Sequence, residues 1–357
     1  MTIESICFEA NWNETTIHLA SPEPTTQDKV RRAVFNIFSV LLPPLGIARL
    51  LNYGIDCFAN RVSLPSAHYI SKTHFERATK QFNEFWEGPI TEKNEALRKN
   101  YTLIRGTVIT PDKSALKAVC MQYKDSTPET PTVIYFNGNF QLGIETPTWI
   151  LSKSIEAHCP CNFVLFDYRG VGASTGAFKG AKDLVIDGSS IVEWVKQKIG
   201  IKTHQIHFYG FSLGGAISSL TKALDPTHLT GRLINDRSFS SSHKVLEARY
   251  GSGMFGRMVN WLFAKHGYSA DAMAAFQEAS GEKMVIYHPD DAIIPTEASM
   301  QYAVHHNLAI RLEPKPGFEE QSRENHHVTP LHWYDTAIER VVEFLFPFST
   351  LIAESVV

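Results

Sequence analysis

A serine flanked by glycines occupies the segment Ile206–Ala216, in which Gly210, Ser212 and Gly214 form a Gly-x-Ser-x-Gly pattern. Apolar residues precede this pattern, and small residues suited to the start of a helix follow it. A serine held in a strained turn between a strand and a helix projects its Oγ from the sheet as a nucleophile. The backbone amide of Leu213, at the helix start, would face a developing oxyanion. The pattern therefore predicts nucleophilic catalysis by Ser212.

A nucleophilic serine needs a histidine base and a carboxylate that holds the tautomer of that histidine. Asp290 and Asp291 follow a buried apolar run, and Asp236 follows an earlier one. For Asp236, a capping or loop role is the favoured interpretation. The adjacent His326 and His327 lie in a polar loop before the last helical segment. Each of these residues is a candidate for the acid or the base.

The same histidines could instead bind a metal, because His326, His327 and His332 are close in sequence. Adjacent histidines point apart, however, and no His-x-x-x-His pattern with a glutamate is present. We therefore expect neither a metal nor a cofactor. The five cysteines form no CxxC pair or even framework, which favours a reducing compartment. They are Cys7, Cys57, Cys120, Cys159 and Cys161.

Charge and composition exclude some classes of partner and location. The formal net charge of −3 and the absence of a long basic block give no reason to expect a nucleic acid partner. A hydrophobic fraction of 43% is enough for a full globular core. The first residues lack the basic and apolar regions of a Sec-type signal peptide. A cytoplasmic protein is expected, with non-classical secretion as the alternative.

The chain divides near residue 100. Residues 1–100 show helical patterns and are expected to form an N-terminal helical extension. In residues 101–357, short apolar runs alternate with helical stretches, which is typical of a doubly wound α/β sheet. The predicted strands are Tyr101–Thr110, Ala115–Gln122, Thr132–Phe136, Phe163–Phe166, Ile206–Tyr209, Leu233–Ile234, Met284–Tyr287 and Ala309–Leu312.

An apolar tract lies within residues 28–58, where two helices are expected around Pro43-Pro44. One interpretation packs them on the catalytic domain. The other is weak, reversible contact with a membrane surface, which the basic pair Arg31-Arg32 would assist. A membrane-spanning helix is disfavoured, because prolines and a glycine interrupt a tract of marginal length.

The region from about Tyr101 onward resembles the α/β-hydrolase superfamily, in particular its serine-peptidase-like and lipase-like branch. Three segments besides the serine motif carry the resemblance: Asn137–Phe140, Asp167–Gly176 and Asp236–Ser241. The Asn-Gly-Asn variant and the helical extension are similar to hydrolase-like proteins of intracellular bacterial parasites. The resemblance implies an α/β-hydrolase fold, with a mostly parallel eight-stranded sheet and helices on both faces.

The resemblance also implies roles for individual residues. The second oxyanion donor would be the backbone amide of Asn139 or, second, of Phe140. The family pattern places the acid four residues before a proline, which selects Asp291. The base would be His327, from a His-Val motif, or His326, from a His-Asn version of it.

Within Asp167–Gly176, the favoured role of Arg169 is structural pairing with a carboxylate, and Asn137 stands where the family usually has histidine. The insertion 243–283 is unusually apolar and is expected to form a cap over the site, with ordinary helix-on-sheet packing as the alternative.

The resemblance thus predicts a serine hydrolase that cleaves an acyl ester or thioester, with a small-molecule or lipid acyl substrate. A peptidase of the same fold is one alternative. A non-catalytic binding or effector protein on a hydrolase scaffold is the other.

Overall fold

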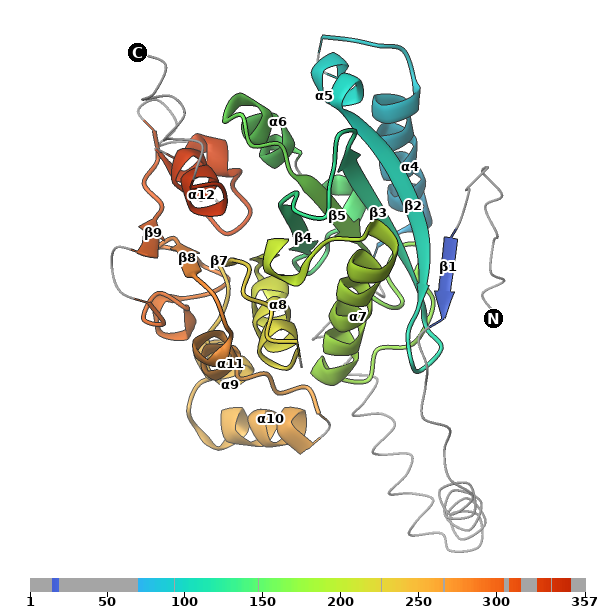
Figure 1. The fold of residues 1–357 in the computed structure, drawn as a ribbon. Helices are drawn as coiled ribbons and strands as arrows, with labels where there is room; N and C mark the ends of the chain where they lie inside the picture. The colour runs from blue at the N-terminus through green and yellow to red at the C-terminus, as the bar shows by residue number, and fades with distance from the viewer. Residues whose placement is uncertain are drawn as a thin grey trace, which may run out of the picture.

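The computed structural model describes residues 70–347 except for 93, 147, 226, 266, 305–307, 316–325 and 335, together with the backbone of residues 15–18. It shows one mixed sheet with helices on both faces (Figure 1). The strands are β1 (Thr15–His18), β2 (Tyr101–Ile109), β3 (Ala115–Tyr123), β4 (Thr132–Phe136), β5 (Asn162–Phe166), β6 (Ile206–Phe211), β7 (Leu233–Asp236), β8 (Lys283–Tyr287) and β9 (Ala309–Arg311). The helices are α4 (Lys72–Glu87), α5 (Glu95–Asn100), α6 (Trp149–Glu156), α7 (Ala181–Trp194), α8 (Leu213–Ala223), α9 (Ser242–Tyr250), α10 (Met254–Lys265), α11 (Ala272–Glu278) and α12 (Ala337–Leu345).

The strands lie in the order β1-β2-β3-β5-β4-β6-β7-β8-β9. Strand β3 runs antiparallel to both of its neighbours, and every other pair is parallel. All residues of β4, β5, β6 and β7 are buried, as expected for parallel strands covered on both faces. The carboxyl ends of these strands meet at one edge of the sheet, which is where such folds place their functional loops.

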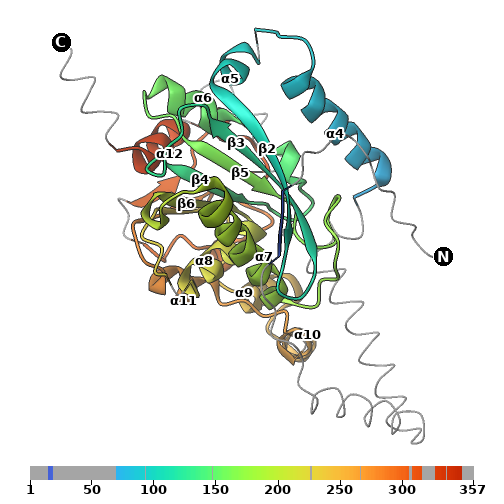
Figure 2. The ribbon, with the colours of Figure 1, turned by 45° about the vertical axis from the view of Figure 1, so that its right-hand side comes forward.

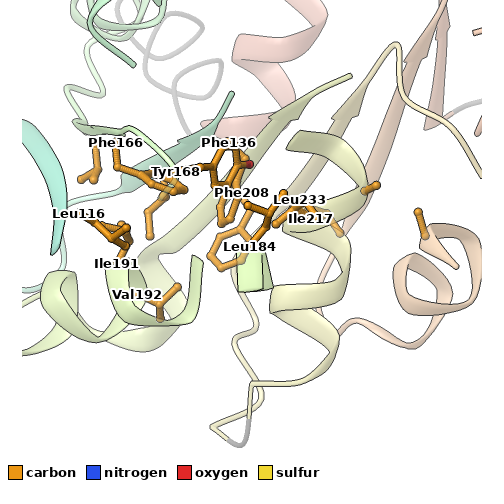
Figure 3. Close-up of a cluster of buried hydrophobic side chains, with 14 of the residues drawn as sticks. Leu116, Phe136, Phe166, Tyr168, Leu184, Ile191, Val192, Phe208, Ile217 and Leu233 are labelled. Atoms are coloured by element: carbon orange, nitrogen blue, oxygen red, sulfur yellow. The ribbon is translucent and has the colours of Figure 1, made fainter. Parts of the chain in front are cut away.

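Two apolar clusters hold the helices on the two faces of the sheet. On one face, Phe136 and Phe208 of the sheet pack with Leu184 and Ile191 of α7 and with Ile217 of α8 (Figure 3). On the other face, the second cluster joins α6 and α12 to the sheet (Figure 2). Full burial of one such side chain contributes about 1.5–3 kcal/mol. The two faces therefore fix the strands whose ends carry the site.

All eight strands predicted between residues 101 and 312 are present, and the bounds of each agree to within two residues. The predicted α/β-hydrolase fold, with a mostly parallel eight-stranded sheet, is confirmed for β2–β9. Strand β1 extends the sheet by parallel pairing with β2, so Thr15–His18 form a strand within the region where helical patterns predicted a helical extension. A run of four residues is too short to show a reliable period in the sequence.

Several other expectations concern segments outside the sheet. The tract 28–58 lies outside the described residues, so contact between it and a membrane stays a prediction. Within the described residues, no helix is both long and apolar enough to cross a membrane. The insertion 243–283 contains α9, α10 and α11, and α11 packs against α8.

Candidate active site

Ser212 lies at the sharp turn between β6 and α8, with φ 52° and ψ −119°. Such a backbone conformation costs a non-glycine residue about 1–3 kcal/mol, so the surrounding structure must impose it. A Cβ at Gly214 would lie 1.9 Å from the carbonyl oxygen of Phe136, and one at Gly210 would lie 2.4 Å from the carbonyl oxygen of Gly214. The strand–serine–helix turn predicted from the sequence is thus present, and close packing explains its two glycines.

His327 connects the serine to a carboxylate. Its Nε2 lies 2.8 Å from the Oγ of Ser212, and its Nδ1 lies 2.8 Å from Oδ2 of Asp291. All three side chains are buried. Because an ionised carboxylate only accepts hydrogen bonds, Nδ1 carries the ring proton and Nε2 accepts the serine hydroxyl. This arrangement can take a proton from Ser212 as its oxygen attacks an electrophile.

The second oxygen of Asp291 is also held. Its Oδ1 accepts the backbone N–H groups of Ile293 and Ile294, both at 2.8 Å. The alternative acid Asp290 is exposed, and its backbone N–H donates to Nδ1 of His288. Of the two neighbouring aspartates, the structure therefore brings Asp291 to His327.

A buried ion pair at the end of β7 holds the loop that carries His327. Nε and Nη2 of Arg237 donate to the carboxylate of Asp236 at 2.7 and 3.1 Å. Nη1 of Arg237 donates to the carbonyl oxygens of Thr329, at 2.5 Å, and of His326, at 3.3 Å. These carbonyls lie on either side of His327. The third acid candidate, Asp236, is therefore a partner of Arg237 rather than of the histidine.

The predicted oxyanion donors lie on two segments. Leu213 is the first residue of α8, so its amide is among those without an acceptor inside the helix. In the opposite loop, the amide of Phe140 donates to Oδ1 of Asn139 at 3.2 Å. The Phe140 amide thus already has an acceptor in this structure. The oxyanion roles of Leu213, Asn139 and Phe140 stay predictions.

Asn137 braces the loop that precedes these amides. Its Nδ2 donates to the carbonyl oxygen of Phe166 at the end of β5, at 2.6 Å. Its Oδ1 accepts the hydroxyl of Thr146 at 3.2 Å. Asn137 is fully buried, so both polar ends need such partners. The asparagine that replaces the usual histidine thus ties the β4 loop to the neighbouring strand.

Comparison with known proteins shows which hydrolases this chain is similar to. The family model of the X-Pro dipeptidyl-peptidases (S15 family) matches residues 162–301. The protein bem46 of Schizosaccharomyces pombe is 25% identical over 193 residues, which are 52% of this chain and 62% of that protein. The lysophosphatidylserine lipase ABHD12 of Danio rerio is 26% identical over 178 residues, 46% of this chain and 44% of that protein. The chain thus spans less than two thirds of the length of these curated relatives. A solved acetyl xylan esterase from Paenibacillus is 13% identical, with a TM-score of 0.49, and the alignment covers 77% of this chain and 94% of that one.

The chain has the α/β-hydrolase fold, and in sequence it is similar to hydrolases of this fold. The resemblance noted from its motifs is therefore confirmed at the level of the fold.

In this α/β hydrolase, Arg169 has the structural role expected of it. The side chain is buried, and its Nε and Nη2 donate to Oδ1 of Asp187 at 2.9 and 2.7 Å. Asp112 accepts from the same guanidinium at 2.5 Å. Burial raises the pKa of Asp187 to about 6, although Arg169 opposes the shift. The network fixes the loop after β5 and takes no part in the Ser212–His327 contact.

His326, the other candidate base, stacks on His288 instead of reaching the serine. The ring centroids are 3.7 Å apart and the planes are 9° from parallel. Together with Asp290, these rings form a group of three possible ligand atoms within 4.8 Å of one another. A metal bonds an imidazole nitrogen in the plane of the ring, and two stacked parallel planes share no such point. Nδ1 of His288 also already accepts the N–H of Asp290. The geometry therefore does not fit a metal ion.

Sequence reasoning missed the role of Arg237. It singled out Asp236–Ser241 as a motif and assigned Arg237 no function. The only available signal was an arginine directly after a short apolar strand. The carbonyls that it holds lie 89 and 92 residues further along the chain.

Proposed function

We propose that this α/β hydrolase is a serine hydrolase that cleaves an acyl ester or thioester in a lipase-like or esterase-like reaction. The observation that carries this proposal is the hydrogen-bonded series Asp291–His327–Ser212, with 2.8 Å between each pair of polar atoms. The series is buried and lies at the carboxyl edge of the sheet. A scaffold that only bound a partner would have no need to align these three groups.

The reaction follows from the atoms that meet. Ser212 Oγ attacks the acyl carbon while Nε2 of His327 takes its proton, and Asp291 stabilises the imidazolium that forms. The amide of Leu213 at the start of α8 donates to the tetrahedral oxyanion, assisted by the helix dipole. His327 then returns the proton to the leaving group, and water hydrolyses the acyl-enzyme by the same steps.

The surface beside the site favours an apolar acyl group. Three loops that carry predicted site residues also present an apolar side chain to solvent: Phe140 beside Asn139, Ile293 after Asp291, and Val328 after His327. All three side chains are at least half exposed. An acyl chain lying over such a rim would bury apolar surface, which favours binding. The similarity to a lysophosphatidylserine lipase is in keeping with a lipid acyl substrate.

A peptidase is the second candidate, because the S15 family model matches residues 162–301. That match includes Ser212 and Asp291 and ends before His327. The same three groups would then attack an amide. The choice between ester and amide is one of substrate binding, which turnover measures directly.

The test is turnover of a substrate panel by the full chain. The panel contains p-nitrophenyl esters of increasing acyl length, an acyl thioester, a lysophospholipid and an X-Pro p-nitroanilide, with Ser212→Ala as the control. Ester or thioester turnover that vanishes in the control supports the proposal. If only the anilide is cleaved, a peptidase function replaces the proposed ester or thioester hydrolysis. No turnover of any member, together with no reaction of Ser212 with an active-site probe, would leave a non-catalytic scaffold.

A further inference from the structure

Helix α10 presents a large apolar surface to solvent. Its inner side packs, through Val259 and Phe263, into the apolar cluster that holds α7 and α8 on the sheet. The outer face consists of Met254, Phe255, Met258 and Trp261, whose exposed fractions are 90%, 60%, 49% and 58%. Residues 254, 258 and 261 are spaced at i, i+4 and i+7, which places them along one side of a helix. Soluble proteins rarely leave such a contiguous apolar surface uncovered unless it meets a partner.

The segment that carries this outer face is rich in positive charge. Residues 242–267 contain Lys244, Arg249, Arg257 and Lys265 and a single carboxylate, Glu247. These counts give a net charge of +3 in a segment of a chain whose overall formal charge is −3. Helix α10 itself has no acidic residue. Nζ of Lys265 lies 4.9 Å from the ring of Trp261, so positive charge directly borders the apolar side chains.

Helix α10 lies at the end of the molecule that carries the site. The amide of Ala181 donates to the carbonyl oxygen of Gly267, just after α10. The ring of Tyr268 packs on Phe178, in the segment that follows the carboxyl end of β5, and also on Phe263 of α10. Figures 1 and 2 show α10 at the outer edge of the molecule, beyond α9. The outer face is therefore exposed near the edge of the sheet formed by the carboxyl ends of the strands, where Ser212 is located.

We propose that the outer face of α10 docks on an anionic lipid membrane surface. Aromatic and thioether side chains enter the interface, while the flanking cations meet acidic headgroups. The charge pattern disfavours a second copy of this chain as the occupant, because two surfaces of net charge +3 repel each other. The proposal does not depend on catalysis, although docking at this end would bring the site to a source of acyl lipids.

Vesicle co-flotation of the full chain tests the proposal. Vesicles of phosphatidylcholine alone are compared with vesicles of phosphatidylcholine mixed with phosphatidylserine. Phe255→Ser/Trp261→Ser removes two apolar anchors and should weaken partition into the mixed vesicles by roughly tenfold or more. Arg257→Gln/Lys265→Gln should weaken it by about thirtyfold, since each of the two basic residues near an anionic surface contributes about 1 kcal/mol. High salt should lower binding of the parent protein but change that of this charge variant less.

The matched control is Ile90→Ser/Leu224→Ser, which removes two side chains of similar exposure, 66% and 68%, outside α10. This control should float like the parent. All three double variants alter exposed positions, and far-UV circular dichroism with thermal unfolding checks that each is folded. The proposal is overturned if the parent fails to bind mixed vesicles, or if Phe255→Ser/Trp261→Ser binds as well as the parent. It is also overturned if sedimentation shows a parent dimer that this variant abolishes, because a second copy would then cover the face.

Discussion

Replacing Arg237 with methionine removes the guanidinium that joins Asp236 to the loop of His327. The carboxylate of Asp236 would keep the hydroxyl of Tyr209, at 2.8 Å, and lose its counter-charge in a buried site. Breaking a buried pair in this way costs about 3–5 kcal/mol of stability. The carbonyl oxygens of His326 and Thr329 would lose the guanidinium as a donor, and the hydroxyl of Tyr334 would still donate to that of His326 at 3.4 Å.

The effect on turnover follows from geometry. His327 must keep Nε2 at hydrogen-bond distance from Ser212 Oγ, and a displacement of about 1 Å can cost roughly 100-fold in rate. We therefore expect Arg237→Met to lower kcat by about 100-fold and to change KM little, because Arg237 is a positioning residue that acts through the loop that carries His327. Ester hydrolysis at saturating substrate measures kcat, and urea unfolding measures stability.

A second variant separates positioning from charge balance. In Asp236→Asn/Arg237→Met, no unpaired buried charge remains, so most of the lost stability should return. The loop that carries His327 still lacks the guanidinium of Arg237, so kcat should stay low. If kcat recovers together with the free energy of unfolding, Arg237 only balances Asp236, and the positioning argument is refuted.

Three further outcomes are expected. Asp291→Asn should lower turnover by about 10⁴-fold by stabilising the wrong tautomer, whereas Asp290→Asn should be nearly silent; the reverse order would show that the acid is misassigned. His326→Phe should retain turnover because it preserves a stacked ring, and His327→Ala should lose it; equal losses would contradict the assignment of the base. Burial lowers the pKa of His207 to about 3, so the stability that it contributes is present above pH 6.5 and is lost as the pH falls toward 3. Between pH 7 and pH 4.5, the free energy of unfolding of the parent should fall by about 2.5 kcal/mol more than that of His207→Asn; equal losses in urea unfolding would show that His207 is not held neutral.

Much of the site was predictable because its signals are local. The turn around Ser212 combines a strand, close-packed glycines and a helix start within eleven residues, and Asp291 follows a buried strand. Local signals do not choose between His326 and His327, since neighbours in a turn point in different directions. Their contacts differ only in the folded chain, where His326 stacks on His288 and Nε2 of His327 lies 2.8 Å from Ser212 Oγ.

The parts that were missed depend on contacts between distant segments. Arg237 acts on carbonyls far along the chain, which no spacing rule reaches. Asn137 acts through the end of another strand, so the sequence showed that it replaces a histidine but not what it does. The apolar residues of α10 were visible in the sequence as a cap-like insertion. The exposure of these side chains could not be predicted, because the same composition suits a helix buried on the sheet.

Reaction of Ser212 with a fluorophosphonate probe tests the central claim most directly. Intact-mass measurement of the full chain should show one covalent adduct, and peptide mapping should place it on Ser212. Labelling should vanish in Ser212→Ala and slow sharply in His327→Ala, because the hydroxyl depends on Nε2 of His327 at 2.8 Å for its activation. Unchanged labelling of Ser212→Ala would place the nucleophile elsewhere. An unreactive parent would contradict the assignment of these three groups to catalysis.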